Sequence, residues 1–574
     1  MSFKELSLAT LADHISITNL SAAAVIVSFL FICSVRINNK KKIAAGDTNT
    51  VKTPLHVRSY VPILGSALEM SKNIRKFIDK YSTKYNEPIF TAKIGNDHCL
   101  FIGDPDHVMM TYRYPKQLNA IAVQTQFTRN VLGIDHKKEH LMFRTEFAKE
   151  ASKHYHKYLF SGPELSKTIQ DAQRIFVTIL PKLVIGGKEK EEYHQHDLYT
   201  MVRNCIFKAS IEPLISKHLA TDEAAALFQE FGKGIPLVMF GEAPSFLVKK
   251  SVSARNSLLD MINHKRFLQQ GSDLIKARHS VDWDQFDIGG GAFSRGTLGL
   301  TFAAVGNSIP VVFWMLYHII ENKDAYEKIQ QEVQKVLHDK KQQKLKESDN
   351  DDSNSNSNNE DDPSLFTLQE LDQMVNLKSA FTEALRMYQG VFSTKDVVTD
   401  FVFDPKKKGQ SKYFIKKGTR IMAFVATHHY DPDIFDHPEI YQYDRFAPTI
   451  VTTSTTKTKK DSDGNDDSHG DETVVVQKLV PPVFTKNGKR VLEPVRAFGG
   501  GSHLCPGRKF IAYEIQAFVV LLITKFDMKL VGSMEGGGTL DDNGNRPEID
   551  YSMQGVGISH PNKDVVVEIR LKQE

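Results

Sequence analysis

The sequence predicts a mainly helical body with a minor β part, held to a membrane by one transmembrane helix near its amino terminus. Three observations predict this. An uncharged run precedes a basic cluster, two short alternating stretches follow, and helical periodicity dominates much of the remaining chain. With 574 residues, of which 41% are hydrophobic, the chain has ample apolar material for a large core.

The amino-terminal run is predicted to be a transmembrane anchor over residues 15–36, after a short tail over residues 1–14. Residues 20–35 contain no charge, and Arg36 and Lys40 to Lys42 follow at once. Positive charge on the carboxyl side of a first span favours keeping that side in the cytosol. A cleaved signal peptide is the alternative, but its basic residues would precede the apolar run.

After a basic and polar linker over residues 37–53, we expect one domain over residues 54–574. Glu87 to Asp104 predicts two short strands around a Gly-Asn-Asp turn. Two stretches are too polar to bury and are predicted to be surface insertions without regular structure, at residues 339–364 and 449–478. A third polar stretch, residues 535–547, predicts a hairpin or loop.

The uncharged run from Thr297 to Ile320 is long enough for a second transmembrane helix. Its middle contains Gly306, Asn307, Ser308 and Pro310. In a bilayer the polar side chains would lie in hydrocarbon, and the proline, which has no N–H, would leave a backbone carbonyl without its donor. We therefore expect a long central helix buried in protein and kinked near Pro310. A local opening in such a helix is a place where a ligand can be admitted.

Charge and cysteine spacing exclude some classes of protein. The net charge of +4 is small for this length, and no basic stripe is interleaved with aromatic residues, so nucleic acid is a poor candidate partner. The spacing of the cysteines suggests neither a disulfide framework nor a zinc site. The four are Cys33, Cys99, Cys205 and Cys505.

Only Cys505 has a context typical of reactive chemistry. It follows three glycines, at 499 to 501, and precedes a predicted helix over Lys509 to Thr524. The glycines permit a tight turn and let the backbone approach a large planar group. A helix amino terminus lowers the pKa of a thiol and can point N–H groups at the sulfur. A phosphate loop or a plain turn is the alternative for a glycine-rich turn before a helix.

Neither alternative uses Phe498, Gly501, Cys505 and Gly507 at this spacing, F-x-x-G-x-x-x-C-x-G, which resembles the haem-binding loop of the cytochromes P450. The resemblance implies the P450 fold, haem b as cofactor, Cys505 as the axial iron ligand, and the other three residues as cofactor-binding. His503 is also implied to bind the cofactor, in the place where the family usually has an arginine contacting a haem propionate. Histidine donates to a carboxylate more weakly and in a pH-dependent way.

Glu383 and Arg386 lie on one face of a predicted helix, where such a pair is usually a solvated ion pair. Together with the cysteine loop, this E-x-x-R resembles the K-helix motif of the family, and Arg445 in Tyr443-Asp-Arg445-Phe446 matches its third member. The resemblance implies a buried ion network that supports the region behind the haem. The polar insertion at 449–478 accounts for an unusually long gap between Arg445 and Cys505.

The central helix departs from the A-G-x-(D/E)-T pattern typical of P450 monooxygenases. No carboxylate is present, and Asn307 stands where the threonine would be. An amide is a poor proton donor, so proton relay would fall to water with Asn307 and Ser308, the catalytic candidates. Simple drift within an ordinary hydroxylase is the alternative explanation. The Asn-Ser-Ile-Pro…Phe-Trp run resembles the branch of sterol and bile-acid hydroxylases and prostacyclin synthase, which implies a bulky lipid substrate.

Three functions follow from the resemblance. The first is a monooxygenase of the endoplasmic reticulum membrane that takes electrons from NADPH through NADPH-cytochrome P450 reductase and uses dioxygen to hydroxylate a lipophilic, sterol-like or other lipid substrate. The second is a haem-thiolate isomerase or dehydratase that acts on a lipid peroxide without a reductase. The third is a membrane-tethered haem-binding protein without turnover.

Overall fold

The computed structural model describes most of the chain from Val51 onward. The described residues are 51–59, 65–95, 97–134, 145–184, 192–239, 244–280, 291–348, 365–405, 410–457, 472–500, 504–531 and 546–573. Two compact units are present, one of Met1–Val51 with Lys406–Lys412 and one of Lys52–Pro405 with Tyr413–Glu574. The predicted anchor at residues 15–36 lies outside the described residues. All elements discussed below lie in the second unit, apart from residues at the ends of β1 and β9.

A six-stranded sheet forms the main β part of the molecule, in the order β2-β3-β4-β10-β7-β5. The strands are β2 (Leu55–Val57), β3 (Ile89–Ile94), β4 (Asp97–Ile102), β5 (Leu118–Asn119), β7 (Phe392–Val397) and β10 (Arg420–Phe424). The two strands predicted within Glu87 to Asp104 are β3 and β4, which pair antiparallel with Ile89 opposite Ile102. Helix α3 (Ile74–Tyr85) packs on this sheet, because the Phe77 ring lies against Phe90 and Phe101.

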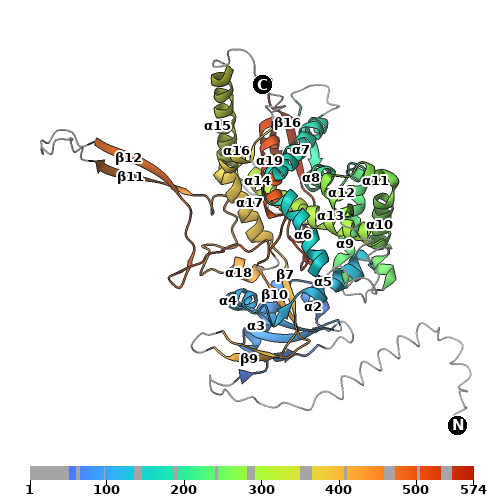
Figure 1. The fold of residues 1–574 in the computed structure, drawn as a ribbon. Coiled ribbons are helices and arrows are strands. Elements are labelled where there is room, and N and C mark those ends of the chain that lie inside the picture. Colours follow the sequence, from blue (N-terminus) through green and yellow to red (C-terminus); the bar gives the residue numbers. More distant parts are fainter. Residues whose placement is uncertain are drawn as a thin grey trace, which may run out of the picture. The chain divides into compact units, whose positions relative to one another are not determined.

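Helices make up most of the rest, so the predicted mainly helical fold with a minor β part is confirmed (Figure 1). The longer ones are α6 (Thr145–Leu159), α7 (Pro163–Ile179), α8 (Leu198–Leu214), α9 (Asp222–Met239), α10 (Ser245–Asn263), α13 (Ala292–Val305), α14 (Ser308–Glu321), α15 (Lys323–Ser348), α17 (Val375–Tyr388) and α19 (Arg508–Lys525). The shorter ones are α2 (Ala67–Met70), α4 (Pro105–Met110), α5 (Ile121–Phe127), α11 (Lys265–Gln269), α12 (Asp273–Ser280), α16 (Leu368–Asp372) and α18 (Ala426–His429).

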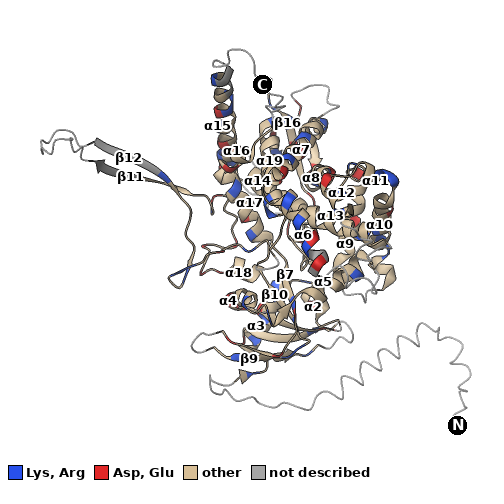
Figure 2. Cartoon of the chain, viewed as in Figure 1, with Lys and Arg blue, Asp and Glu red and all other residues tan. Residues whose placement is uncertain are grey.

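The core is built around α14 and α19, whose apolar residues are buried on nearly all sides. In Figure 2, Lys, Arg, Asp and Glu colour outer helices such as α6 and α15, whereas the α14 ribbon is almost free of charge. A helix that is apolar all round belongs in a protein core or a membrane. Here 67% of the most apolar window of the run Ala292–Glu321 is buried inside the protein, as expected for a core helix.

The predicted kink near Pro310 takes the form of a short break at Gly306 and Asn307, three to four residues before the proline. Helix α13 ends at Val305 and α14 begins at Ser308, with Gly306 and Asn307 between them. Pro310 itself lies in the first turn of α14. The first backbone N–H groups of a helix have no intrahelical acceptor, so a proline there removes nothing. The break places Asn307 in a connecting turn.

Parts of both polar insertions have regular structure, which the composition did not predict. Residues 339–348 continue α15, since this stretch is rich in lysine and glutamine, which favour helices. Residues 449–457 form β11 and pair antiparallel with β12 (Glu472–Val480), because both contain many β-branched residues. In Figure 1 this two-stranded ribbon extends away from the neighbouring helices.

The segment from residue 546 onward joins a sheet and contacts the central helix α14. Strand β16 (Val566–Leu571) is the middle strand of a three-stranded sheet, between β15 (Phe526–Leu530) and β6 (His194–Asp197). Before it, Ser559 accepts a hydrogen bond at its carbonyl from the indole of buried Trp314, at 2.8 Å. The remaining short strands are β1 (Val51–Lys52), β8 (Phe401–Phe403), β9 (Lys412–Ile415), β13 (Thr485–Lys486) and β14 (Lys489–Arg490).

Candidate active site

Cys505 lies two residues before Gly507, the residue that caps the amino terminus of α19, as the sequence pattern predicts. Its backbone N–H donates to the carbonyl of Phe498 at 2.9 Å, which closes the glycine turn. Burial raises the pKa of the Cys505 thiol, and hydrogen bonds from the backbone of Gly507 and Arg508 partly oppose this. The N–H groups at the helix start thus point at the sulfur, but burial has the larger effect on the pKa of the thiol. Gly501 and His503 lie outside the described residues.

The Cys505 cavity has a volume of about 790 Å³, within the usual range for small-molecule sites. Cys505 and Gly507 line one wall, and small residues of α13, Gly299 and Ala303, line another. Small residues leave room for a flat group between the helix and the thiol. The described residues that line this cavity include no Asp or Glu.

Two cations lie beside the cysteine loop. Lys395 Nζ and Arg496 Cζ are 4.1 Å and 4.7 Å from the centroid of the Tyr112 ring. Burial, and then the nearby Arg496, lower the pKa of Lys395 to about 8. Arg496 Nε is buried without a hydrogen-bond partner. A Cβ at Gly500 would lie 2.1 Å from Arg496 Nη1, so this cation presses on the loop itself.

Buried like charges are unfavourable unless an anion lies between them. The exposed Glu493 is the one carboxylate that pairs with Arg496 in the described part of the chain, and it leaves Lys395 uncompensated. A group with two carboxylates would fit here. The cavity, the thiol and these cations therefore suit haem, whose propionates are anionic. Sequence reasoning missed both residues, because they meet only when β7 lies beside the loop.

The structure brings Glu383, Arg386 and Arg445 into one buried network. Arg386 donates from Nε and Nη2 to both carboxylate oxygens of Glu383, each at 2.7 Å. Arg445 Nε donates to Glu383 Oε1 at 3.0 Å. The side chains of Glu383 and Arg386 are fully buried. Such a paired arrangement satisfies charges that would be costly alone.

His429 connects this network with the cysteine loop. Its carbonyl accepts from Arg386 Nη1 at 2.9 Å, and its ring Nε2 accepts from the backbone N–H of Arg496 at 2.9 Å. Burial holds the pKa of His429 well below its usual value, so the ring is neutral and able to accept. His429 thus links the Glu383–Arg386–Arg445 network to the segment that leads into the cysteine loop.

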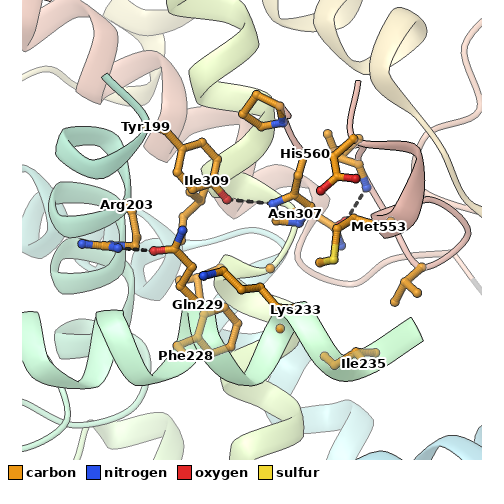
Figure 3. Close-up of a pocket in the computed structure, with 18 of the residues that line it drawn as sticks. Tyr199, Arg203, Phe228, Gln229, Lys233, Ile235, Asn307, Ile309, Met553 and His560 are labelled. Carbon is orange, nitrogen blue, oxygen red and sulfur yellow. Dashed lines mark hydrogen bonds between the residues drawn. The ribbon is translucent and has the colours of Figure 1, made fainter. Parts of the chain in front are cut away.

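The two catalytic candidates of the central helix do not line the Cys505 cavity. Asn307 Oδ1 accepts from the backbone N–H of Ile558 at 2.9 Å, and its side chain faces a separate pocket (Figure 3). The hydroxyl of Ser308 is buried and donates to the carbonyl of Ala304, one turn back on α13. Both groups are thus engaged with the backbone.

A thiol at a helix start that faces a cavity, with two cations beside its loop and a mainly helical body, fits a haem-thiolate protein. The comparisons agree. The family model for Cytochrome P450 matches residues 294–536. The fold resembles that of retinoic acid bound cyanobacterial CYP120A1, with a TM-score of 0.57, 16% identity, and coverage of 91% of this chain and 100% of that one.

Curated relatives place the chain more closely. Cytochrome P450 7B1 of Mus musculus is 22% identical over 96% of this chain and 95% of the relative. The 25-hydroxycholesterol 7-alpha-hydroxylase of Rattus norvegicus is 22% identical over 71% and 85%, and prostacyclin synthase of Rattus norvegicus is 22% identical over 90% and 94%. The chain belongs to the cytochrome P450 superfamily and is an oxidoreductase. Within that superfamily it lies in the branch of these 7-alpha-hydroxylases and prostacyclin synthase.

Proposed function

We propose that this protein is a monooxygenase that hydroxylates a sterol-like or other lipid substrate. Dioxygen is the co-substrate, and NADPH supplies electrons through cytochrome P450 reductase. The observation that carries the proposal is the Cys505 thiol, which lines a cavity with mostly apolar walls. Relatives named as hydroxylases support the same reaction. We also propose that residues 15–36 anchor the protein in the endoplasmic reticulum membrane, with the catalytic body in the cytosol.

The residues of the site have separate tasks. Bound haem supplies the redox chemistry, and a thiolate ligand favours cleavage of the O–O bond. Cys505 would hold the iron, and Lys395 and Arg496 would bind the propionates. Gly299 and Ala303 are small residues of α13 that would leave space in the cavity for a substrate. Glu383 and its two arginine partners keep the loop in place and take no part in turnover.

A second candidate is an isomerase or dehydratase that acts on a lipid peroxide without a reductase. The observation that favours it is the absence of a carboxylate among the described lining residues, together with the hydroxyl of Ser308 bound to Ala304. A peroxide rearrangement needs no protons from solvent, whereas dioxygen reduction does. Prostacyclin synthase is among the relatives.

One experiment separates the two. The full-length protein is placed in lipid vesicles with cytochrome P450 reductase, and 25-hydroxycholesterol or a lipid endoperoxide is added with and without NADPH. The monooxygenase proposal expects product from the sterol that requires NADPH and consumes it in proportion. Conversion of the endoperoxide alone, equally fast without NADPH, would support the second candidate and reject the first.

A further inference from the structure

A second cavity of about 280 Å³ lies beside the break between α13 and α14 (Figure 3). We call it the side pocket. Helices α8 and α9, the break itself and the carboxyl-terminal segment form its walls. Phe302 and Val556 line both the side pocket and the Cys505 cavity, so only these two side chains are common to the two spaces among the described residues. A flexible ligand that passes them can occupy both.

Arg203 supplies a cation to this pocket, and it forms no ion pair with a carboxylate among the described residues. Its Nε donates to the amide oxygen of Asn204 at 3.0 Å, and its Nη1 donates to that of Gln229. Both acceptors are neutral. Burial lowers the pKa of Arg203, and the charges of Asp222 and Asp564 offset only part of this effect. An anion in the pocket would add the missing compensation.

Lys233 is the second cation of the side pocket. Its side chain extends across the pocket toward Gln229 (Figure 3), and its ammonium also lies 3.2 Å from Glu230 on the same helix. Lys563 lines the pocket as well. Because an exposed helix-surface ion pair is weak, Glu230 does not prevent Lys233 from binding another anion.

The two carboxylates that line the side pocket are already bound to other groups. Asp564 accepts from the backbone of Tyr199 and Thr200 at 2.6 Å and 3.1 Å, at the start of α8. Asp550 accepts from the backbone and hydroxyl of Ser552. A carboxylate held by several donors repels a neighbouring anion less than a solitary one would. Three cations face two such carboxylates, so the pocket favours negative charge.

The remaining polar groups add hydrogen bonds without charge. The hydroxyl of Tyr199 lies 2.7 Å from His560 Nδ1 (Figure 3). Burial raises the pKa of Tyr199 and lowers that of His560 to about 4, so both are neutral at pH 7. The pair presents a neutral polar wall, and Phe228 and Ile309 supply the apolar wall.

At about 280 Å³ the side pocket is too small for a whole lipid and suits one end of it. We propose that it binds the carboxylate or sulfate end of an elongated amphipathic substrate, whose apolar body passes Phe302 and Val556 into the Cys505 cavity. This inference rests on the proposed function and narrows its substrate class to anionic lipids. Such an end would meet Arg203 and Lys233 while the carbon to be oxidised lies near the haem.

The test compares acids with their methyl esters, because esterification removes the charge and changes little else. Lithocholic acid, arachidonic acid and their methyl esters are titrated into the haem-loaded full-length protein, and binding is followed by the haem absorption spectrum and by calorimetry. At least one acid should bind about tenfold more tightly than its ester. The sterol and fatty-acid arms tell which kind of lipid is preferred.

Three variants assign this preference to the side pocket. Lys233→Gln and Arg203→Gln should each lower the acid-to-ester ratio about threefold or more and leave ester binding unchanged. Lys328→Gln, on exposed α15 outside the side pocket, is the matched control and should change neither. Equal affinity for acid and ester, or a ratio unaffected by both pocket variants, would overturn the proposal.

A fourth variant tests occupancy without altering charge. A Cβ built at Gly232 meets no atom within 4 Å, so Gly232→Leu fills the side pocket and also favours the helix. It should weaken acid binding at least fivefold and leave imidazole binding at the haem unchanged. Unchanged acid binding contradicts the proposal. Because these readouts need no turnover, an acid preference without NADPH-dependent oxidation would reject the proposed function and leave this inference standing.

Discussion

Cys505 differs from the other described cysteines in its surroundings. Cys99 and Cys205 are buried in the core, where burial raises the pKa of each to about 12, so neither forms a thiolate. We expect Cys505→Ser to lose the red-shifted absorption band that a thiolate gives the reduced, carbon-monoxide-bound haem protein. Cys99→Ser should keep that band. A variant at Cys505 with an unchanged spectrum would contradict the assignment of the axial ligand.

Arg445 contributes its charge to a network from which water is excluded. Arg445→Gln should destabilise the fold by about 3 to 5 kcal/mol, because Glu383 and Arg386 would lose a partner while still buried. Lys323→Gln is the matched control, since Lys323 and Glu327 form an exposed pair at 3.7 Å, with an expected loss below about 1 kcal/mol. Urea unfolding of both variants measures the difference. Equal small losses would show that the network adds little.

Glu514 is a carboxyl buried between α19 and α8, where Ser210 donates to it at 2.6 Å. Burial raises its pKa from 4.5 to about 8. The folded state therefore favours the neutral acid, whereas the unfolded state ionises. Its contribution to stability is complete below about pH 4.5 and is lost as the pH rises toward 8, by about 1.4 kcal/mol per unit.

Glu514→Gln should flatten this dependence, because a neutral amide does not titrate. Unfolding midpoints in urea at pH 5, 6, 7 and 8 give the measurement. We expect the variant to gain stability relative to the unmodified protein as the pH rises. Parallel pH profiles for the two proteins would rule out a titrating Glu514.

At the level of secondary structure, we expect the break in the central helix to depend on Gly306 and Asn307 more than on Pro310, which lies in the first turn of α14. Pro310→Ala should therefore change stability by under about 1 kcal/mol, through the unfolded chain alone. Met315→Pro, in the middle of buried α14, should cost about 3 kcal/mol or more. Thermal unfolding compares them. A large loss in Pro310→Ala would mean that proline shapes the break.

Among the described residues, β11 and β12 form a two-stranded sheet. Ile450 and Leu479 are paired across it, so a two-residue Asn-Gly turn can join them and replace residues 451–478. The shortened protein should bind haem and melt within a few degrees of the full chain. Loss of haem binding would show that the ribbon supports the cysteine loop.

Across the whole molecule, features with short or fixed spacing along the chain could be predicted. The turn before Cys505 and the pairing of Glu383 with Arg386 depend on local geometry. Strands β3 and β4 could be predicted from alternating polar and apolar residues on both sides of a turn. The distortion of the central helix was predicted near Pro310, and it lies at Gly306 and Asn307, just before the proline. The helical residues 339–348 were missed, because a polar composition indicates that a segment is exposed but not whether it forms a helix.

Contacts between distant segments could not be predicted. Asn307 binds Ile558, 251 residues away, and this contact turns the amide from the Cys505 cavity. Lys395 and Arg496 both lie against the Tyr112 ring. No local pattern marks such pairs, because the pairing is set by how the sheet and loops fold together. The side pocket could not be predicted from the sequence either, because its walls come from four separate segments.

The carboxyl-terminal segment has a consequence for biosynthesis. Residues 546–571 supply Val556 to both cavities, Ile558 to Asn307 and the middle strand of the β15-β16-β6 sheet. This segment follows the other walls of the two cavities in the chain, so a nascent chain cannot complete them until residues 546–571 have been made. A chain that stops before residue 546 would thus lack a wall of both cavities and the middle strand of this sheet, and quality control would meet a polypeptide with an open interior.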